Sequence, residues 1–185
     1  MIIMGIDPSI NCTGVCIYDT LTGNNMYYMI VSKATQKMLE FTHKNVLIVP
    51  YNKEIYTDDI YTVKEKKKTN NINSICNIIK DIILWHEPEL AYMEGVSYGS
   101  TGSAALVDLS GLNYCLRQTM LQQNLDYQIL SPTSVKKFAV GNGSAEKDVI
   151  IASWRKLDKN IQNITKIKVD DLADSYFIAH YQEDC

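Results

Sequence analysis

Short apolar runs separated by polar turns open the chain. Residues 2–6 and 14–18 are two such runs, joined by a polar turn, and residues 25–31 form a third run after a Thr-Gly-Asn turn. Runs of this length, rich in β-branched and aromatic residues and bounded by turn residues, favour strands. We therefore expect three antiparallel strands at the start of the fold.

Beyond residue 70 the pattern changes to helices that alternate with strands. Apolar residues recur at helical spacing over residues 72–83 and 106–120, whereas residues 90–93 and 127–130 are short strand-like runs. This order predicts an α/β fold with a mixed five-stranded sheet flanked by helices. The pattern weakens between Ser32 and Thr69, where an apolar run at residues 46–49 leaves a further strand open.

Capping residues predict the helix starts in the C-terminal part. Ser131 before Pro132 fits an N-cap followed by proline at the first helical position. Ser144, after a Gly-Asn-Gly sequence, indicates a second helix start, with apolar residues at helical spacing as far as residue 157. A last helix is expected to hold residues 172–179.

Length and composition predict one domain over residues 1–185, with residues 32–69 as an inserted segment. The chain has 185 residues, a net charge of −3 and a hydrophobic share of 46%, which is ordinary for a globular protein. No apolar run approaches the roughly 20 residues of a membrane span, and the N-terminus lacks the basic start of an export signal. The five scattered cysteines fit reduced thiols. We expect a cytoplasmic protein without a membrane partner.

The acidic average hides a basic stretch. Residues 136–168 carry eight Lys or Arg residues, opposed by Glu146, Asp148 and Asp158 alone. A basic stretch of this kind is typical of phosphate binding, although a solvated helical face would look the same.

Acidic residues stand directly after two of the apolar runs. Asp7 follows the first run and Glu94 follows the run at residues 90–93, which places both acids at the ends of strands. A hydrogen-bonded turn residue before Pro8 is the alternative interpretation of Asp7. An acid at either position is poorly explained as an ordinary surface charge.

The last helix carries a second group of acids. Asp171 and Asp174 are three residues apart and share one helical face, where like charges repel unless a cation lies between them. Asp170 pairs with Asp174 at a spacing of four residues, so spacing leaves open which of the two adjacent acids points inward. The helix dipole alone would also favour acids in a first turn.

Together the four acids Asp7, Glu94, Asp171 and Asp174 predict a divalent-metal site. Mg²⁺, with Mn²⁺ as the alternative, takes oxygen ligands of this kind. Two cations about 3.5–4 Å apart would activate a water and stabilise the leaving oxygen of a phosphodiester. The three histidines fit no nucleophilic triad motif.

The sequence GNGSAEK at residues 141–147 is rich in glycine but is not a nucleotide loop. It lacks the GxxxxGK[ST] pattern of a Walker A motif and the third glycine of a dinucleotide fingerprint, so we expect no nucleotide cofactor. Backbone amides near Ser144 and the ammonium of Lys147 are candidates for holding a DNA phosphate. A plain capped helix is the alternative.

These motifs resemble the RuvC-type Holliday junction resolvases, bacterial and bacteriophage. GIDPSINCTGVCIYD at residues 5–19 resembles the family's first hairpin, and MEGV at residues 93–96 its glutamate strand. SVKKFAVGNGSAEK at residues 134–147 is similar to the lysine-bearing segment, and DDLADS at residues 170–175 to the terminal acidic helix. The motifs stand in the family's order over nearly the whole chain.

The resemblance implies a ribonuclease H-like fold and a homodimer that nicks two opposed strands of a four-way DNA junction. It implies metal binding by the four acids Asp7, Glu94, Asp171 and Asp174, and contacts of Lys136 and Lys147 with the scissile phosphate. The family's glutamate is usually followed by Gln, Val and Phe, but here by Gly95, Val96, Ser97 and Tyr98. Tyr98 is the candidate to stack on a base in place of that phenylalanine.

Three other functions remain open from the sequence. One is a nuclease of the same fold that acts more broadly on branched DNA or structured RNA. Another is a protein that binds junctions without cutting, which the complete set of acids disfavours. The third is an actin-like ATPase, whose first hairpin is similar; a chain of 185 residues is short for the two domains that such proteins need to enclose ATP.

Overall fold

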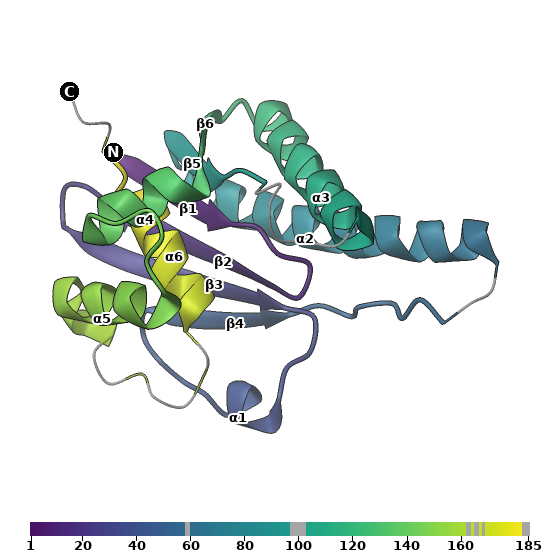
Figure 1. Ribbon diagram of the computed structural model, residues 1–185, viewed down its shortest axis with the longest axis horizontal. Helices are drawn as coiled ribbons and strands as arrows, with labels where there is room; N and C mark the ends of the chain where they lie inside the picture. Colours follow the sequence, from purple (N-terminus) through teal and green to yellow (C-terminus); the bar gives the residue numbers. More distant parts are fainter. Residues whose placement is uncertain (58–59, 97–102, 162–163, 165–166, 168, 183–185) are drawn as a thin grey trace.

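A mixed six-stranded sheet forms the centre of the molecule in the computed structural model, which describes residues 1–185 except 58–59, 97–102, 162–163, 165–166, 168 and 183–185. The strands follow the order β4-β3-β2-β1-β5-β6 across the sheet (Figure 1). Their bounds are β1 Ile2–Asp7, β2 Cys12–Asp19, β3 Asn24–Val31, β4 Val46–Pro50, β5 Leu90–Glu94 and β6 Asp126–Leu130. Strand β2 runs antiparallel to both of its neighbours, and the other pairs are parallel.

The sheet has one strand more than the five that the sequence predicts. The additional strand is β4, which pairs in parallel with β3 from Tyr27↔Val46 to Val31↔Pro50 and forms the edge of the sheet. A five-residue apolar run does not reveal its pairing partner, because strand pairing depends on contacts distant in sequence. The three antiparallel strands expected at the start of the fold are confirmed.

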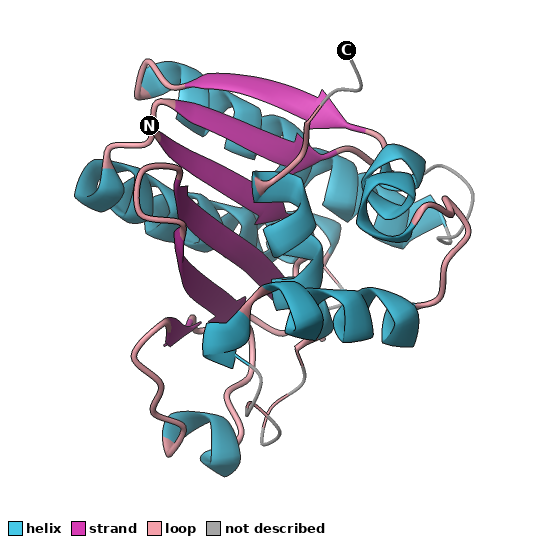
Figure 2. Ribbon diagram, turned by 90° about the vertical axis from the view of Figure 1, so that its left-hand side faces the viewer, coloured by secondary structure: helices cyan, strands magenta, loops and turns pink. Residues whose placement is uncertain are grey.

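Helices cover both faces of the sheet (Figure 2). Side chains alternate along β3, so that Tyr27 and Met29 pack with the C-terminal helices while Tyr28 and Ile30 pack with α2 and α3. The helices are α1 Gln36–Leu39, α2 Tyr61–His86, α3 Ser103–Gln122, α4 Pro132–Val140, α5 Lys147–Leu157 and α6 Asp170–Ala179, with a 3₁₀ turn at Lys159–Ile161. None of the described helices is long and apolar enough to cross a membrane.

The expected cap at Ser131 is confirmed, but the one at Ser144 is wrong. The Ser131 side chain accepts a hydrogen bond from the Ser134 amide, and proline follows in the first turn. Helix α5 begins at Lys147 instead, and Glu146 occupies its N-cap without a side-chain cap hydrogen bond. The Ser144 amide donates to Asn142 Oδ1 in the preceding turn at 3.0 Å, so a local side chain satisfies this amide.

Two glycines let α6 lie directly on the sheet. A Cβ atom at Gly5 would be 2.4 Å from the amide nitrogen of Ala179, and one at Gly14 would be 2.0 Å from the carbonyl oxygen of Asp171. Because no other residue leaves this space, the helix backbone approaches β1 and β2 more closely than side-chain packing would allow. This close approach sets the distance between the acids of α6 and the ends of the strands.

Candidate active site

Asp7 and Glu94 lie at the carboxyl ends of two adjacent parallel strands. The register pairs Ile6 of β1 with Met93 of β5, so the next residue on each strand is the acid. The two side chains share a hydrogen bond, which is one of the influences on the pKa of Glu94. The strand-end positions expected from the sequence therefore bring these two carboxyls into contact.

Helix α6 brings Asp171 and Asp174 to the same end of the sheet, where β1 and β5 terminate. Gly14 is the register partner of Asp7 on β2, and the backbone of Asp171 lies against Gly14. The charges of both helix acids raise the pKa of Asp7, as does the charge of Glu94. Asp7 therefore interacts with each of the other three acids proposed from the sequence.

The pKa values of these acids report desolvation and mutual repulsion. Burial is the largest cause that raises the pKa of Asp7 well above its usual value, followed by the charges of Glu94, Asp174 and Asp171. Burial, then the charge of Asp174, raises the pKa of Glu94 to about 7, and burial also raises the pKa of Asp174 to about 6. A cluster of acids that resists ionisation gains most from a bound cation.

The donor set fits a hard divalent ion. Carboxylate oxygens from β1, β5 and α6 converge without a competing soft ligand, apart from the Cys12 thiol, which forms a hydrogen bond with Asp171. Burial, then the charge of Asp171, raises the pKa of this thiol, which favours the neutral form. Among the described residues, no three His, Cys, Asp or Glu side chains are already arranged as ligands of one ion.

Asp170, which the sequence left as an alternative to Asp171, forms an ion pair with Lys147, and its charge also acts on Asp174. Its side chain is 4% exposed, and Oδ2 lies 2.8 Å from the Nζ atom of Lys147, whose side chain is 62% exposed. The hydrogen bond to Asp170 is the largest of the causes that raise the pKa of Lys147. Sequence reasoning missed this ion pair because its members are 23 residues apart and share no local motif.

Two lysines proposed to contact phosphate act on the acids electrostatically. The positive charges of Lys136 and Lys147 lower the pKa values of Glu94 and Asp174 against the stronger effect of burial. Lys136 is partly buried on α4, and Ser144 is exposed. Tyr98, the proposed stacking residue, lies outside the described residues.

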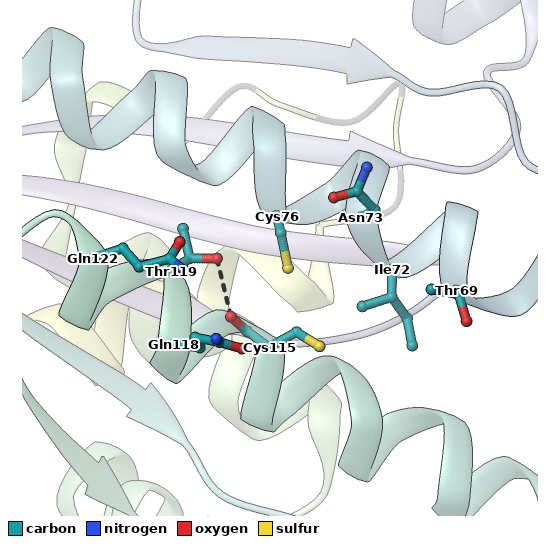
Figure 3. A pocket seen from close by; sticks show the side chains of 8 residues that line it. All are labelled: Thr69, Ile72, Asn73, Cys76, Cys115, Gln118, Thr119 and Gln122. Atoms are coloured by element: carbon teal, nitrogen blue, oxygen red, sulfur yellow. Dashed lines mark hydrogen bonds between the residues drawn. The ribbon is translucent and has the colours of Figure 1, made fainter.

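A pocket between α2 and α3 has a different chemistry (Figure 3). Its volume is about 250 Å³, and its lining includes Cys76 and Cys115 but no carboxylate. The dashed line in Figure 3 is the hydrogen bond from Thr119 Oγ1 to the Cys115 carbonyl oxygen, 2.9 Å long, which is a local helix contact. This pocket therefore lacks the carboxylates that a hard divalent ion prefers.

Comparison with known proteins gives the family. The model of the family described as crossover junction endodeoxyribonuclease RuvC matches residues 49–180. This chain belongs to the RuvC family. A curated relative from Rickettsia felis, named crossover junction endodeoxyribonuclease RuvC, is 26% identical over 180 residues, which are 97% of this chain and 96% of the relative. A relative from Rickettsia bellii is 24% identical over the same length, 97% of this chain and 95% of the relative.

Solved RuvC structures share the fold. Thermus thermophilus RuvC in complex with Holliday junction substrate superposes with a TM-score of 0.63 at 16% identity, over 97% of this chain and 90% of that chain. The yeast mitochondrial Holliday junction resolvase Ydc2 gives a TM-score of 0.58 at 14% identity, over 96% of this chain and 75% of that chain. The ribonuclease H-like mixed α/β fold, the resemblance to RuvC and the enzyme class, a nuclease, are thereby confirmed.

Proposed function

We propose that this RuvC-family nuclease resolves four-way DNA junctions by metal-dependent hydrolysis of phosphodiesters on two opposed strands. One observation carries the proposal. Four acids lie at the carboxyl ends of β1 and β5 and on α6: Asp7, Glu94, Asp171 and Asp174. Burial and mutual repulsion raise the pKa values of three of them, Asp7, Glu94 and Asp174. Such a site is matched to a divalent cation and a phosphodiester, which supplies oxygens of its own.

The four acids would hold two Mg²⁺ ions, with Mn²⁺ as an alternative. When bound, the ions would supply a nucleophilic water and stabilise the leaving oxygen. Asp7 would hold metal from β1, since the charges of the other three acids all act on it. Glu94 would hold metal from β5, and Asp171 and Asp174 would hold it from α6.

The lysines beside the acids would hold the scissile phosphate. Lys147 forms its ion pair with Asp170 and still exposes 62% of its side chain, so its other N–H groups can face a phosphate oxygen. Lys136 acts on the same acids from α4. Ser144 would line the approach from the preceding turn, and we keep Tyr98 as the candidate to stack on an opened base.

The substrate explains why the protein would work as a homodimer. Each chain carries one set of the four acids, whereas symmetric resolution needs two cuts on opposed strands. Two copies related by a two-fold axis would present two sites to a junction that has the same symmetry. Within each copy we propose a single nuclease domain over residues 1–185.

The proposal is tested by nicking of an end-labelled mobile four-way junction against a linear duplex of the same sequence. Metal-dependent, symmetric nicks at the junction are expected with Mg²⁺ and none with chelator. Equal cutting of forks and flaps would instead indicate a broader branched-DNA nuclease. Junction binding without cutting in Mg²⁺ or Mn²⁺ would refute the catalytic assignment.

A further inference from the structure

The first residues of α5 and α6 form an ion pair with each other. Lys147 begins α5 and Asp170 begins α6, and the two helices lie side by side (Figure 1). Lys147 Nζ donates to Asp170 Oδ2 at 2.8 Å. The carboxylate is 4% exposed, whereas the lysine side chain is 62% exposed. A buried acid therefore holds the end of a side chain that otherwise faces solvent.

Ion pairing of this kind is not general in the basic stretch of the chain. Within the part of the chain that the structure describes, Lys136, Lys137, Lys156 and Lys159 form no ion pair. A positive charge in the first turn of a helix also opposes the helix dipole, so the start of α5 is an unfavourable place for the charge of Lys147. The ion pair thus belongs to a lysine whose position needs another explanation.

The charge of Lys147 reaches the proposed metal site. It lowers the pKa values of Asp7, Glu94 and Asp174 against the larger effect of burial. Among the described residues, however, its ammonium donates to Asp170 and to none of these three carboxylates. Lys147 is therefore held close to the acids without occupying their oxygens.

The backbone that carries Asp170 is itself fixed in place. The next residue, Asp171, lies against Gly14, where an added Cβ atom would be 2.0 Å from the Asp171 carbonyl oxygen. Leu172 follows and is fully buried. Asp170 therefore has a set position relative to Asp171 and Asp174, which belong to the same helix.

A lysine without such an anchor would have to be ordered by the substrate. Its long stem loses more rotamer freedom on ordering than most side chains do. An ammonium group has three N–H donors, so the contact with Asp170 leaves others for a phosphate oxygen. Because the side chain is ordered before the DNA binds, that loss of freedom does not have to occur during the reaction.

We propose that Asp170 is a positioning residue that holds the Lys147 ammonium where it meets the scissile phosphate. The inference rests on the proposed function, in which Lys147 contacts that phosphate and the four acids hold the metal. Asp170 acts through Lys147 and is not itself a metal ligand. The two adjacent acids at the start of α6 therefore have different tasks, since Asp171 holds metal and Asp170 holds the lysine.

The test is a double-mutant cycle on the single-turnover nicking rate, with enzyme in excess over a four-way junction and saturating Mg²⁺. Asp170→Asn keeps the size of the side chain and removes the charge that holds the ammonium. We expect the rate to fall about tenfold, because the phosphate contact is no longer set in advance. In the Lys147→Ala background the same change should have no further effect on the rate.

Junction affinity separates a misplaced lysine from a missing one. Lys147→Ala removes a cation, so the slope of log affinity against log salt, measured with chelator, should fall by about 0.9. Asp170→Asn keeps that cation, so its salt slope should be unchanged and its affinity should stay within about twofold of the wild type. A variant that binds like the wild type but nicks more slowly has lost the placement of the lysine and not its charge.

Asp158→Asn is the matched control for a general loss of packing. Asp158 is also buried, and it accepts hydrogen bonds from the Tyr27 hydroxyl at 2.7 Å and from Asn25 Nδ2 at 3.2 Å. It follows the last residue of α5, at the opposite end of that helix from Lys147. This change should lower stability but leave the nicking rate of the folded protein unchanged. Equal losses of rate in Asp158→Asn and Asp170→Asn would overturn the positioning role.

A second measurement, on protein without metal or DNA, is independent of nicking. By ¹³C relaxation, the Lys147 Cε group should be restricted in the wild type and in Asp158→Asn, and as mobile as that of exposed Lys137 in Asp170→Asn. Unchanged mobility, a wild-type nicking rate in Asp170→Asn, or a further fall in rate in the Lys147→Ala background would overturn the inference. If the wild type nicks no junction while the mobility changes as expected, the proposed function fails although Asp170 does anchor the lysine.

Discussion

Gly14 and Asp171 are in direct contact where α6 crosses β2. A Cβ atom at Gly14 would lie 2.0 Å from the Asp171 carbonyl oxygen and 2.6 Å from its carbonyl carbon. Because Gly14 is also the register partner of Asp7, this contact sets how far the helix acids stand from the strand acid. A glycine outside the chemistry thus determines the geometry of the site.

Gly14→Ala is expected to lower the free energy of unfolding by about 3 kcal/mol, because neither backbone can yield without moving the helix. The nicking rate should fall by more than the loss of folded protein alone would cause, since α6 carries two of the four acids. Urea unfolding and nicking measure the two effects. Gly111→Ala is the control: its Cβ would meet the flexible end of Ile72 at 3.3 Å in mid-helix, so stability should rise slightly. A fully active, equally stable Gly14→Ala protein would contradict the role of the contact.

Asp7→Asn and Glu94→Gln should each abolish nicking while junction affinity stays within about twofold of wild type. Each change removes a proposed metal ligand without altering the lysines proposed to contact phosphate. In metal-free protein each variant should also melt at a higher temperature, because one of several repelling carboxylates is gone. Asp81→Asn, an exposed acid on α2, is the matched control. Loss of binding together with cleavage would count against the assignment.

Raised carboxyl pKa values predict a pH dependence of stability with a defined sign. Glu94 rises from 4.5 to about 7 and Asp174 from 3.8 to about 6, so the folded state holds these protons more tightly than the unfolded state. The contribution of these groups to the stability of metal-free protein is therefore present at low pH and is lost as pH rises from about 4 to 7. Mg²⁺ should restore stability most near the upper end of this pH range, where the acids are ionised.

Two histidines change the pH dependence of stability in the opposite direction. The test therefore compares the pH profiles of the wild type and a variant. Burial lowers the pKa values of His86 and His180, which makes their contribution grow as pH rises. Subtracting the pH profile of Glu94→Gln from that of the wild type, by chemical unfolding in chelator, cancels the histidines. The difference should fall from pH 4.5 to 7. A flat difference would show that Glu94 has an ordinary pKa.

Lys147→Ala should destabilise the protein by about 2 kcal/mol, because it removes the ammonium group that lies against the buried carboxylate of Asp170; the solvent exposure of Lys147 moderates the loss. Asp170→Asn introduced into Lys147→Ala should recover most of that loss. Lys137→Ala, an exposed lysine on α4, is the control. Additive effects in a double-mutant cycle would show that the two side chains are not coupled. The affinity of Lys147→Ala for junctions is best measured in the Asp170→Asn background.

Local patterns predicted most of the elements. The first three strands, the helical spacing over residues 72–83 and the Ser131 cap all follow from side-chain period and capping, which act between near neighbours. The start of α5 was misplaced because Ser144 lies in an Asn142-capped turn that mimics a helix start. The length of α2 was missed because its first ten residues bury no side chain and so leave no periodic signal.

By itself, the sequence determined that acids follow two strands and repeat on the last helix, that lysines precede that helix, and which family these motifs resemble. Only the tertiary structure decided that the charge of Asp171 acts on Asp7, that Asp170 forms an ion pair with Lys147, and that β4 adds a sixth strand. The physical reason is the rotation and depth of α6, which depend on the contacts of its backbone with Gly5 and Gly14. Those contacts join residues more than 150 positions apart, and spacing along one helix carries no information about them.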